Sequence, residues 1–144
     1  MRLYNIKGKL QSKLVTKYLI EWNKKSRSKI QFKVKQFLKS YWENHVVYEE
    51  FPVYGSRMKV DILNATKKIA VEVNGRQHSS FNSFFHNNSR LNYLASIKRD
   101  VEKREWLEKN GYTLIEIEED EVDKLSEEFI VKNGIKLIYL VGKK

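Results

Sequence analysis

The sequence predicts a mixed α/β fold in which a mixed sheet is flanked by helices. Three consecutive segments between residues 45 and 74 alternate apolar and polar side chains, which is typical of strands. Apolar residues at helical spacing lie before and after these segments. A chain of 144 residues with 41% apolar content is long enough to fold as one domain with a hydrophobic core. The order helices, three-stranded meander, helix, strand is that of a sheet covered by helices.

Two helices are expected before the strands. Residues 10–23 would place Leu10, Leu14, Tyr18 and Trp22 on one helical face. The segment KKSRSK interrupts that pattern, and Ser28 is a suitable N-cap for a second helix. This second helix should have one apolar face and a lysine-rich remainder. The apolar face comprises Ile30, Val34, Phe37, Leu38 and Tyr41, and the lysines are Lys29, Lys33, Lys35 and Lys39.

The strands are expected in three stretches, HVVYEEFPVY, RMKVDILN and KKIAVEVN. The first ends at the turn signal Gly55-Ser56, and the short turn NATK joins the other two into a hairpin. Strict alternation would put Asp61 on the face opposite to Val60 and Ile62. It would likewise put Glu72 on the face opposite to Val71 and Val73.

The remainder of the chain predicts a polar, aromatic-containing loop over residues 76–90 and a charged helix over residues 91–110, ended by Gly111. A strand, YTLIEIE, a helix, DEVDKLSEEFIVK, and a last strand, IKLIYLV, follow. The expected organisation is one domain over residues 1–144. It divides into a basic helical extension (1–27), a core (28–118) and a C-terminal helix and strand (119–144).

The positive charge lies at one end of the chain. Residues 1–44 hold twelve lysines or arginines and two acids, whereas residues 45–144 hold sixteen of each, so the first third carries the whole net charge of +10. This asymmetry indicates a polyanionic partner, most simply nucleic acid, although a solvated basic face would give the same pattern.

Several classes of protein are not expected from the composition. The sequence has no cysteine, which excludes disulfides and thiolate metal sites and fits a reducing compartment. No apolar run is long enough to cross a membrane, and the first residues lack the apolar segment of a secretion signal. We therefore expect no membrane partner and a cytoplasmic location.

A pair of carboxylates is the strongest chemical signal. The turn between the last two strands of the meander would bring Asp61 and Glu72 roughly opposite each other. Two facing carboxylates repel unless something neutralises them, and a hard divalent cation such as Mg²⁺ does so through oxygen ligands. Two solvent-facing acids on an exposed sheet face are the alternative.

The segments around these acids resemble a known family. "VD", ten residues and "EVNG" are similar to the core of the PD-(D/E)XK nuclease superfamily. "EVNGRQH" is similar to the E-[LV]-D-G-x-Q-H motif of small nucleases related to the very-short-patch repair endonuclease, and "IKRDVEKREWLEKNGYTLIEIE" is similar to the helix and strand that follow it there. The resemblance covers about residues 28–118, and it implies a restriction-endonuclease-like fold and an origin among phage or homing endonuclease genes.

The resemblance also implies a role for each matching residue. Asp61 and Glu72 would bind Mg²⁺, with Mn²⁺ as a substitute, and the Val73 carbonyl would complete the protein's ligands. Gln77 and His78 match the Q-H pair of the motif. His78 would accept the proton of the attacking water or contact the metal through its outer shell.

Two positions depart from the family pattern. The early helix has Gln31 where the family supplies a glutamate, and a neutral amide is a weaker Mg²⁺ ligand. Glu49 or Glu50 could substitute, and alternation of the first strand leaves the choice open. Asn74 stands where the family has a lysine, so His78, Lys98 or Lys103 would have to supply that charge.

The sequence and the resemblance together predict a Mg²⁺-dependent DNA endonuclease, which could act as a homodimer because one site cuts one strand. The rival predictions are a structure-selective nuclease such as a Holliday junction resolvase, and a DNA-binding protein whose catalysis has decayed. The candidate catalytic residues are Gln31, Glu50, Asp61, Glu72, Asn74, Gln77 and His78. The candidate DNA contacts are Lys33, Lys35, Arg76, Lys98, Arg99 and Lys103.

Overall fold

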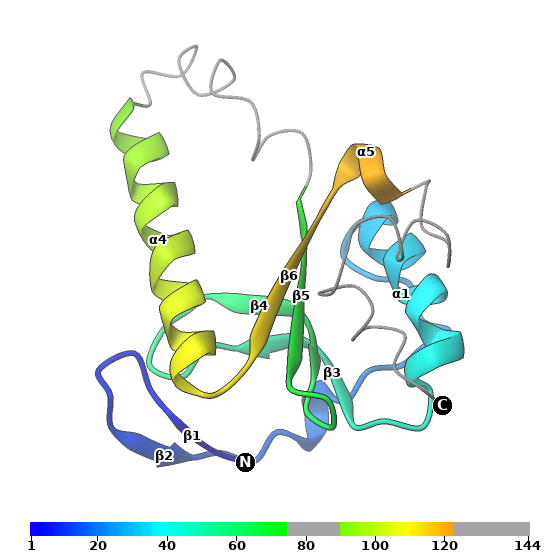
Figure 1. Ribbon diagram of the computed structural model, residues 1–144, viewed down its shortest axis with the longest axis horizontal. Coiled ribbons are helices and arrows are strands. Elements are labelled where there is room, and N and C mark those ends of the chain that lie inside the picture. The colour runs from blue at the N-terminus through cyan, green and yellow to red at the C-terminus, as the bar shows by residue number, and fades with distance from the viewer. Residues whose placement is uncertain (75–89, 123–144) are drawn as a thin grey trace.

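The predicted mixed α/β fold is confirmed by a computed structural model, which describes residues 1–74 and 90–122. Its centre is a four-stranded sheet in the order β3 (Val47–Pro52), β4 (Lys59–Asn64), β5 (Ile69–Asn74), β6 (Thr113–Glu118). The first three strands are antiparallel, and β6 is parallel to β5. Figure 1 shows the sheet between two helices, α1 (Lys29–Trp42) and α4 (Arg90–Lys109).

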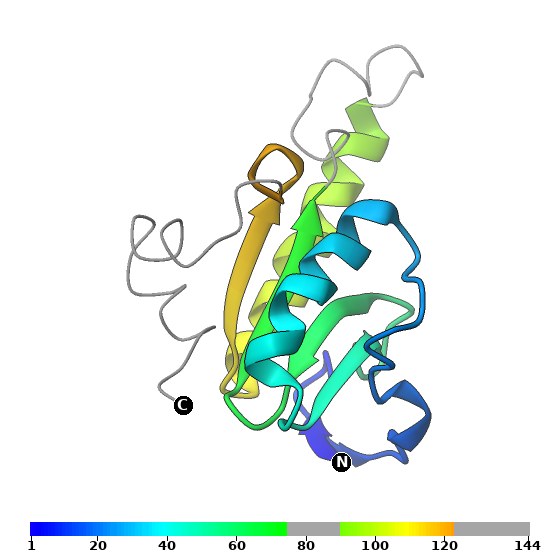
Figure 2. The ribbon, with the colours of Figure 1, turned by 90° about the vertical axis from the view of Figure 1, so that its right-hand side faces the viewer.

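Helix α1 covers one face of the sheet, as Figure 2 shows. It begins where the sequence predicts, because the Ser28 side chain accepts a hydrogen bond from the backbone N–H of Gln31 at 3.2 Å. Its apolar side buries Val34, Leu38 and Trp42 completely against β4, β5 and β6. A short helix, α5 (Glu119–Val122), contributes Val122 to the same core. The rest of the predicted C-terminal helix and strand lies outside the described residues.

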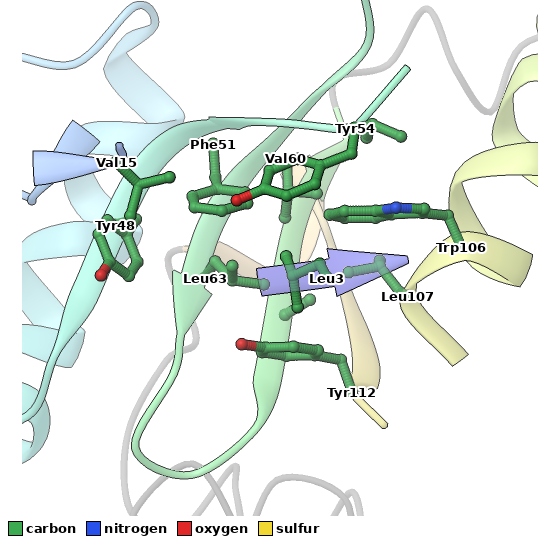
Figure 3. Packing of buried hydrophobic residues seen from close by; sticks show 12 residues of the cluster. Leu3, Val15, Tyr48, Phe51, Tyr54, Val60, Leu63, Trp106, Leu107 and Tyr112 are labelled. Carbon is green, nitrogen blue, oxygen red and sulfur yellow. The ribbon is translucent and has the colours of Figure 1, made fainter. Parts of the chain in front are cut away.

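Helix α4 packs on the other face through its C-terminal end, where Trp106 and Leu107 are its buried residues. Figure 3 shows the Trp106 ring beside Tyr54 and Phe51, with ring centroids 6.0 Å and 6.4 Å from it. After the helix the chain turns at Gly111, whose φ of 80° lies in the left-handed region that favours glycine. The predicted helix and its C-terminal signal are thus confirmed to within a residue.

The prediction of a helical N-terminal extension is wrong. Residues 1–27 instead form a two-stranded hairpin, β1 (Arg2–Tyr4) and β2 (Leu10–Ser12), and one turn of 3₁₀ helix, η1 (Thr16–Tyr18). The residues facing the core are Leu3 and Val15, whereas Leu14 is 92% exposed. The helical spacing was misleading because the turn at residues 5–9 is closed by the Asn5 side chain, which accepts the backbone N–H of Lys7 and Lys9.

Strand β4 does not keep the predicted alternation. Ile62 faces α1, but both Val60 and Leu63 belong to the core cluster on the α4 side. The neighbouring strand changes in the same place: Glu50 has a φ of 51°, and Phe51 falls on the α4 side. The ladder pairs on both sides of Glu50 and Asp61 have the same register, so the strands depart from regular pairing at this one level.

Within the described residues no helix is long and apolar enough to cross a membrane.

Candidate carboxylate–lysine site

Asp61 and Glu72 lie opposite each other, as the sequence predicts. The β4–β5 ladder ends at the pair Ile62 and Val71, and the two acids occupy the next level. There the side chains replace the ladder: the Asp61 backbone N–H donates to Glu72 Oε2 at 2.9 Å, and the Val73 N–H donates to Asp61 Oδ2 at 2.8 Å. Each carboxylate is therefore held by the backbone of the other strand, and the two are forced close together.

This confinement changes the ionisation of Asp61. Burial and the negative charge of Glu72 raise its pKa to about 8, with a smaller contribution from Glu50, while the hydrogen bond from Val73 opposes the shift. Without a metal ion, Asp61 therefore retains its proton near neutral pH, and Glu72 carries the negative charge of the pair.

Lys103 provides the cation of the site. It projects from the C-terminal half of α4, and its ammonium group donates to Glu72 Oε1. The ion pair is largely shielded from solvent, with 17% of the Lys103 side chain and 12% of the Glu72 side chain exposed. Of the two candidates for the missing lysine charge that lie in the described residues, Lys98 and Lys103, the structure brings Lys103 to the carboxylates. Asn74 donates instead to Glu118 at 3.2 Å.

A polar network beneath α1 joins the three candidates Gln31, Glu49 and Glu50. Glu49 is a structural residue, because its carboxylate accepts hydrogen bonds from Lys35, Ser26 and Gln31 at 2.6–2.9 Å. Glu50 accepts from the same Gln31 side chain at 3.2 Å and acts electrostatically on Asp61. Gln31 therefore holds the Glu50 carboxylate near Asp61 and Glu72.

Two sequence predictions are corrected by this network. Lys35 is completely buried and bonded to Glu49 and to the Lys24 carbonyl, so it cannot contact DNA. The side chain turns inward because a buried carboxylate requires a cation. Strict alternation would put Glu49 on the same face as Phe51. The left-handed backbone of Glu50 between them puts them on opposite faces instead.

The carboxylates open into a cleft of about 910 Å³ between α1, the β3–β4 turn and α4. Of the predicted DNA contacts on α1 and α4, Arg99 lines the cleft, whereas Lys98 and Lys33 lie on exposed helix surfaces that do not line it. Three further cations of the lining were missed: Arg27, Arg57 and Lys59. Their signal was present in the sequence, since Arg27 precedes the α1 cap and the other two precede Asp61 at the start of β4.

Three predicted site residues lie outside the described residues: Arg76, Gln77 and His78.

The oxygen atoms of Asp61 and Glu72 suit a hard divalent cation, but they would supply only some of its ligands. The described residues contain no cluster of three or more His, Asp or Glu with the geometry of a metal site. Asp61 Oδ1 accepts no hydrogen bond from the described chain, and carboxylate oxygens that accept one bond retain a second lone pair. Asp61, Glu72 and the Val73 carbonyl could therefore hold a Mg²⁺ ion that keeps several waters, which is its usual preference.

The geometry predicts that restoring a glutamate at position 31 harms the protein. Gln31→Glu removes the amide donor shared by Glu49 and Glu50 and adds a third carboxylate against them at a site 4% exposed. We expect the free energy of unfolding in urea at pH 8 to fall by about 2 kcal/mol. The near-isosteric Gln31→Met, which adds no charge, should cost less. A Gln31→Glu protein as stable as the wild type would contradict the network.

The raised pKa of Asp61 predicts a pH dependence of stability. A carboxyl group whose folded-state pKa exceeds its unfolded value, about 3.9, favours folding in its protonated form. That contribution is complete below about pH 4 and is lost as the pH rises through about 8. Without metal, Asp61→Asn should therefore melt at least about 3 °C above the wild type at pH 8 and near it at pH 4.

Calorimetric scans at the two pH values check this result. Adding Mg²⁺ at pH 8 should reduce the difference in melting temperature between Asp61→Asn and the wild type, because the ion stabilises the wild type selectively. Identical melting temperatures at both pH values would contradict the assigned electrostatics.

The fold and the site define a mixed α/β protein with a partly buried carboxylate pair, a lysine on a facing helix and a cation-lined cleft. No family model and no solved structure matches the chain. Over 66 residues, 46% of this chain, it is 39% identical to Uncharacterized protein 033L of Invertebrate iridescent virus 3 and 35% identical to Uncharacterized protein 094L of Frog virus 3 (isolate Goorha). The matched part is 34% and 43% of those proteins, so the chain spans less than half of their length.

Proposed function

We propose that the protein is a divalent-metal-dependent endonuclease that hydrolyses phosphodiester bonds in DNA, with the architecture of the PD-(D/E)XK superfamily. The observation that supports this most is the Asp61–Glu72 pair, bonded across the end of a strand ladder and faced by Lys103 at the floor of a cation-lined cleft. These groups supply what phosphodiester hydrolysis requires: ligands for a metal ion, a cation to offset charge on the phosphate, and a surface that binds the DNA backbone.

Each group has a proposed task. Asp61, Glu72 and the Val73 carbonyl would hold Mg²⁺ or Mn²⁺, which when bound polarises the phosphate and lowers the pKa of a bound water. Lys103 would offset negative charge that develops on the phosphate, the task that the family gives to the lysine replaced by Asn74. Glu50, fixed by Gln31, would orient the attacking water. His78 remains our candidate for the proton acceptor.

The rim of the cleft would bind the DNA backbone. The cleft is lined by cations from the segment before α1, the β3–β4 turn, the start of β4 and α4, namely Arg27, Arg57, Lys59 and Arg99. Cations arranged in this way contact phosphates and position the duplex without reading its sequence. Viral relatives support an origin in a virus or phage.

Two other functions remain to be separated from this one. A junction resolvase would share the metal, the charge and the fold, and differ in substrate. A decayed DNA-binding protein is favoured by Gln31 and Asn74. The ion pair of Lys103 with Glu72 counts against decay, because it supplies a cation at the carboxylates.

The experiment that tests the proposal is incubation of the purified protein with supercoiled, linear and four-way-junction DNA, each with Mg²⁺ and with chelator. Metal-dependent nicking or linearisation of the circle supports an endonuclease, and linear product without a nicked intermediate supports paired sites in a dimer. Selective resolution of the junction supports the resolvase. Binding to all three without any metal-dependent product would overturn the proposed activity.

A further inference from the structure

All charged side chains of the N-terminal hairpin and the segment that follows it are lysines or arginines. Residues 1–20 contain five lysines or arginines and no acid. One side of the segment packs on the core through Leu3 and Val15, while the cations lie on the exposed side. These exposed cations are Arg2, Lys7, Lys9, Lys13 and Lys17. Such a surface attracts a polyanion.

The hairpin is fixed to the body of the protein rather than attached loosely. The Trp106 indole N–H donates to the Tyr4 carbonyl at 2.6 Å, and the Asn110 side chain both donates to that carbonyl and accepts the Tyr4 N–H. The Tyr54 hydroxyl donates to the Met1 carbonyl at 2.7 Å. These bonds hold the hairpin at the C-terminal end of α4, as Figure 1 shows, so its cations have a defined place.

The hairpin tip is continuous with the cleft. The Ile6 N–H donates to the Tyr54 carbonyl at 3.0 Å, and a Cβ at Gly55 would come within 3.2 Å of the Ile6 side chain. The next residues of the same β3–β4 turn, 56–59, line the cleft. A groove of about 180 Å³ runs between the tip, including Lys7, and Lys109 of α4, and Glu102 lines both this groove and the cleft.

We propose that the β1–β2 hairpin is a second DNA-binding element, which contacts the phosphates of the duplex to one side of the cleaved bond. The proposal rests on the proposed function, because it extends the substrate held in the cleft. A duplex lying over Asp61 and leaving across the β3–β4 turn meets Lys7 and Lys9 next. No ion pair within the described chain engages these two lysines, so both can bind phosphate.

The hairpin lies to one side of the carboxylate pair, at the C-terminal end of α4. The footprint on DNA should therefore extend further to one side of the cut than to the other.

The test compares two double charge reversals in the full chain. Lys7→Glu/Lys9→Glu changes the hairpin tip, and the matched control Lys67→Glu/Lys68→Glu makes the same charge change in the β4–β5 turn, which does not line the cleft. Affinity for a duplex of about 30 base pairs is measured in chelator over a range of salt. The tip variant should bind at least about tenfold more weakly than the control, and its salt slope should fall by about two.

The remaining outcomes decide the proposal independently of catalysis. Affinity is measured in chelator, so the difference between the tip and control variants does not depend on whether the protein cleaves DNA. Tip and control variants with equal affinity for duplex would overturn the hairpin's role even if the protein cleaves DNA. Loss of affinity for single-stranded DNA with duplex affinity kept would overturn it too. Absence of cleavage with the predicted affinity difference would reject the enzyme and keep the binding surface.

Discussion

Asp61→Asn is expected to lower the single-turnover rate of DNA cleavage by at least about 10³-fold, which corresponds to about 4 kcal/mol of transition-state stabilisation. The substitution keeps the shape of the side chain and an oxygen that can accept the Val73 N–H, but it removes the charge that would hold the metal. DNA affinity in chelator should stay within about twofold of wild type, because Asp61 makes no proposed contact with phosphate.

Asp100→Asn is the matched control for this experiment. Asp100 lines the same cleft, is exposed, and undergoes the same change from carboxylate to amide. It should cleave at close to the wild-type rate. Asp61→Asn protein that cuts as fast as the wild type in Mg²⁺ would remove Asp61 from the site, and equal losses in both variants would point to a general effect of charge.

Lys103→Met should lower the cleavage rate by about 10²- to 10³-fold, the typical cost of removing one group that stabilises transition-state charge. Methionine retains most of the apolar length of the lysine side chain, so packing on α4 should change little. Lys98→Met is the control, because Lys98 is exposed on the same helix and does not line the cleft.

A rescue variant makes this second prediction specific. Asn74 lines the cleft beside Glu72 and occupies the position where similar nucleases have their lysine. Adding Asn74→Lys to the Lys103→Met protein should recover at least about tenfold of the lost rate if the lost function is a positive charge at this place. If the double variant is folded and soluble and binds metal as the wild type does, but shows no recovery of the cleavage rate, then Lys103 has a different role.

The order of elements and the carboxylate pair could be predicted from the sequence because both depend on local patterns. Ser28 caps α1, Gly111 ends α4, and a four-residue turn fixes the register that brings Asp61 to Glu72. The N-terminal hairpin could not be found in this way. Its stability depends on contacts between Tyr4 and Trp106, which are 102 residues apart.

The errors within the site have the same origin. Period-two alternation fails at Glu50 because its backbone is left-handed, and no local signal marks a glutamate for that conformation. The inward turn of Lys35 follows from its bond to Glu49, fourteen residues further on. The pairing of Lys103 with Glu72 likewise joins residues 31 positions apart, and spacing alone left Lys98, Lys103 and His78 equivalent.

Among the described residues, the buried side chains of α4 lie near one end of the helix, which has a mechanical consequence. They are Trp106 and Leu107, and a helix of 20 residues would pivot about them. Lys103 lies about 4.5 Å of helix rise from Trp106, whereas Arg90 lies about 24 Å away. A small tilt of the helix about this point would displace Arg90 about five times as much as Lys103. The N-terminal end of α4 would thus move most, while the charge beside Glu72 stays nearly still.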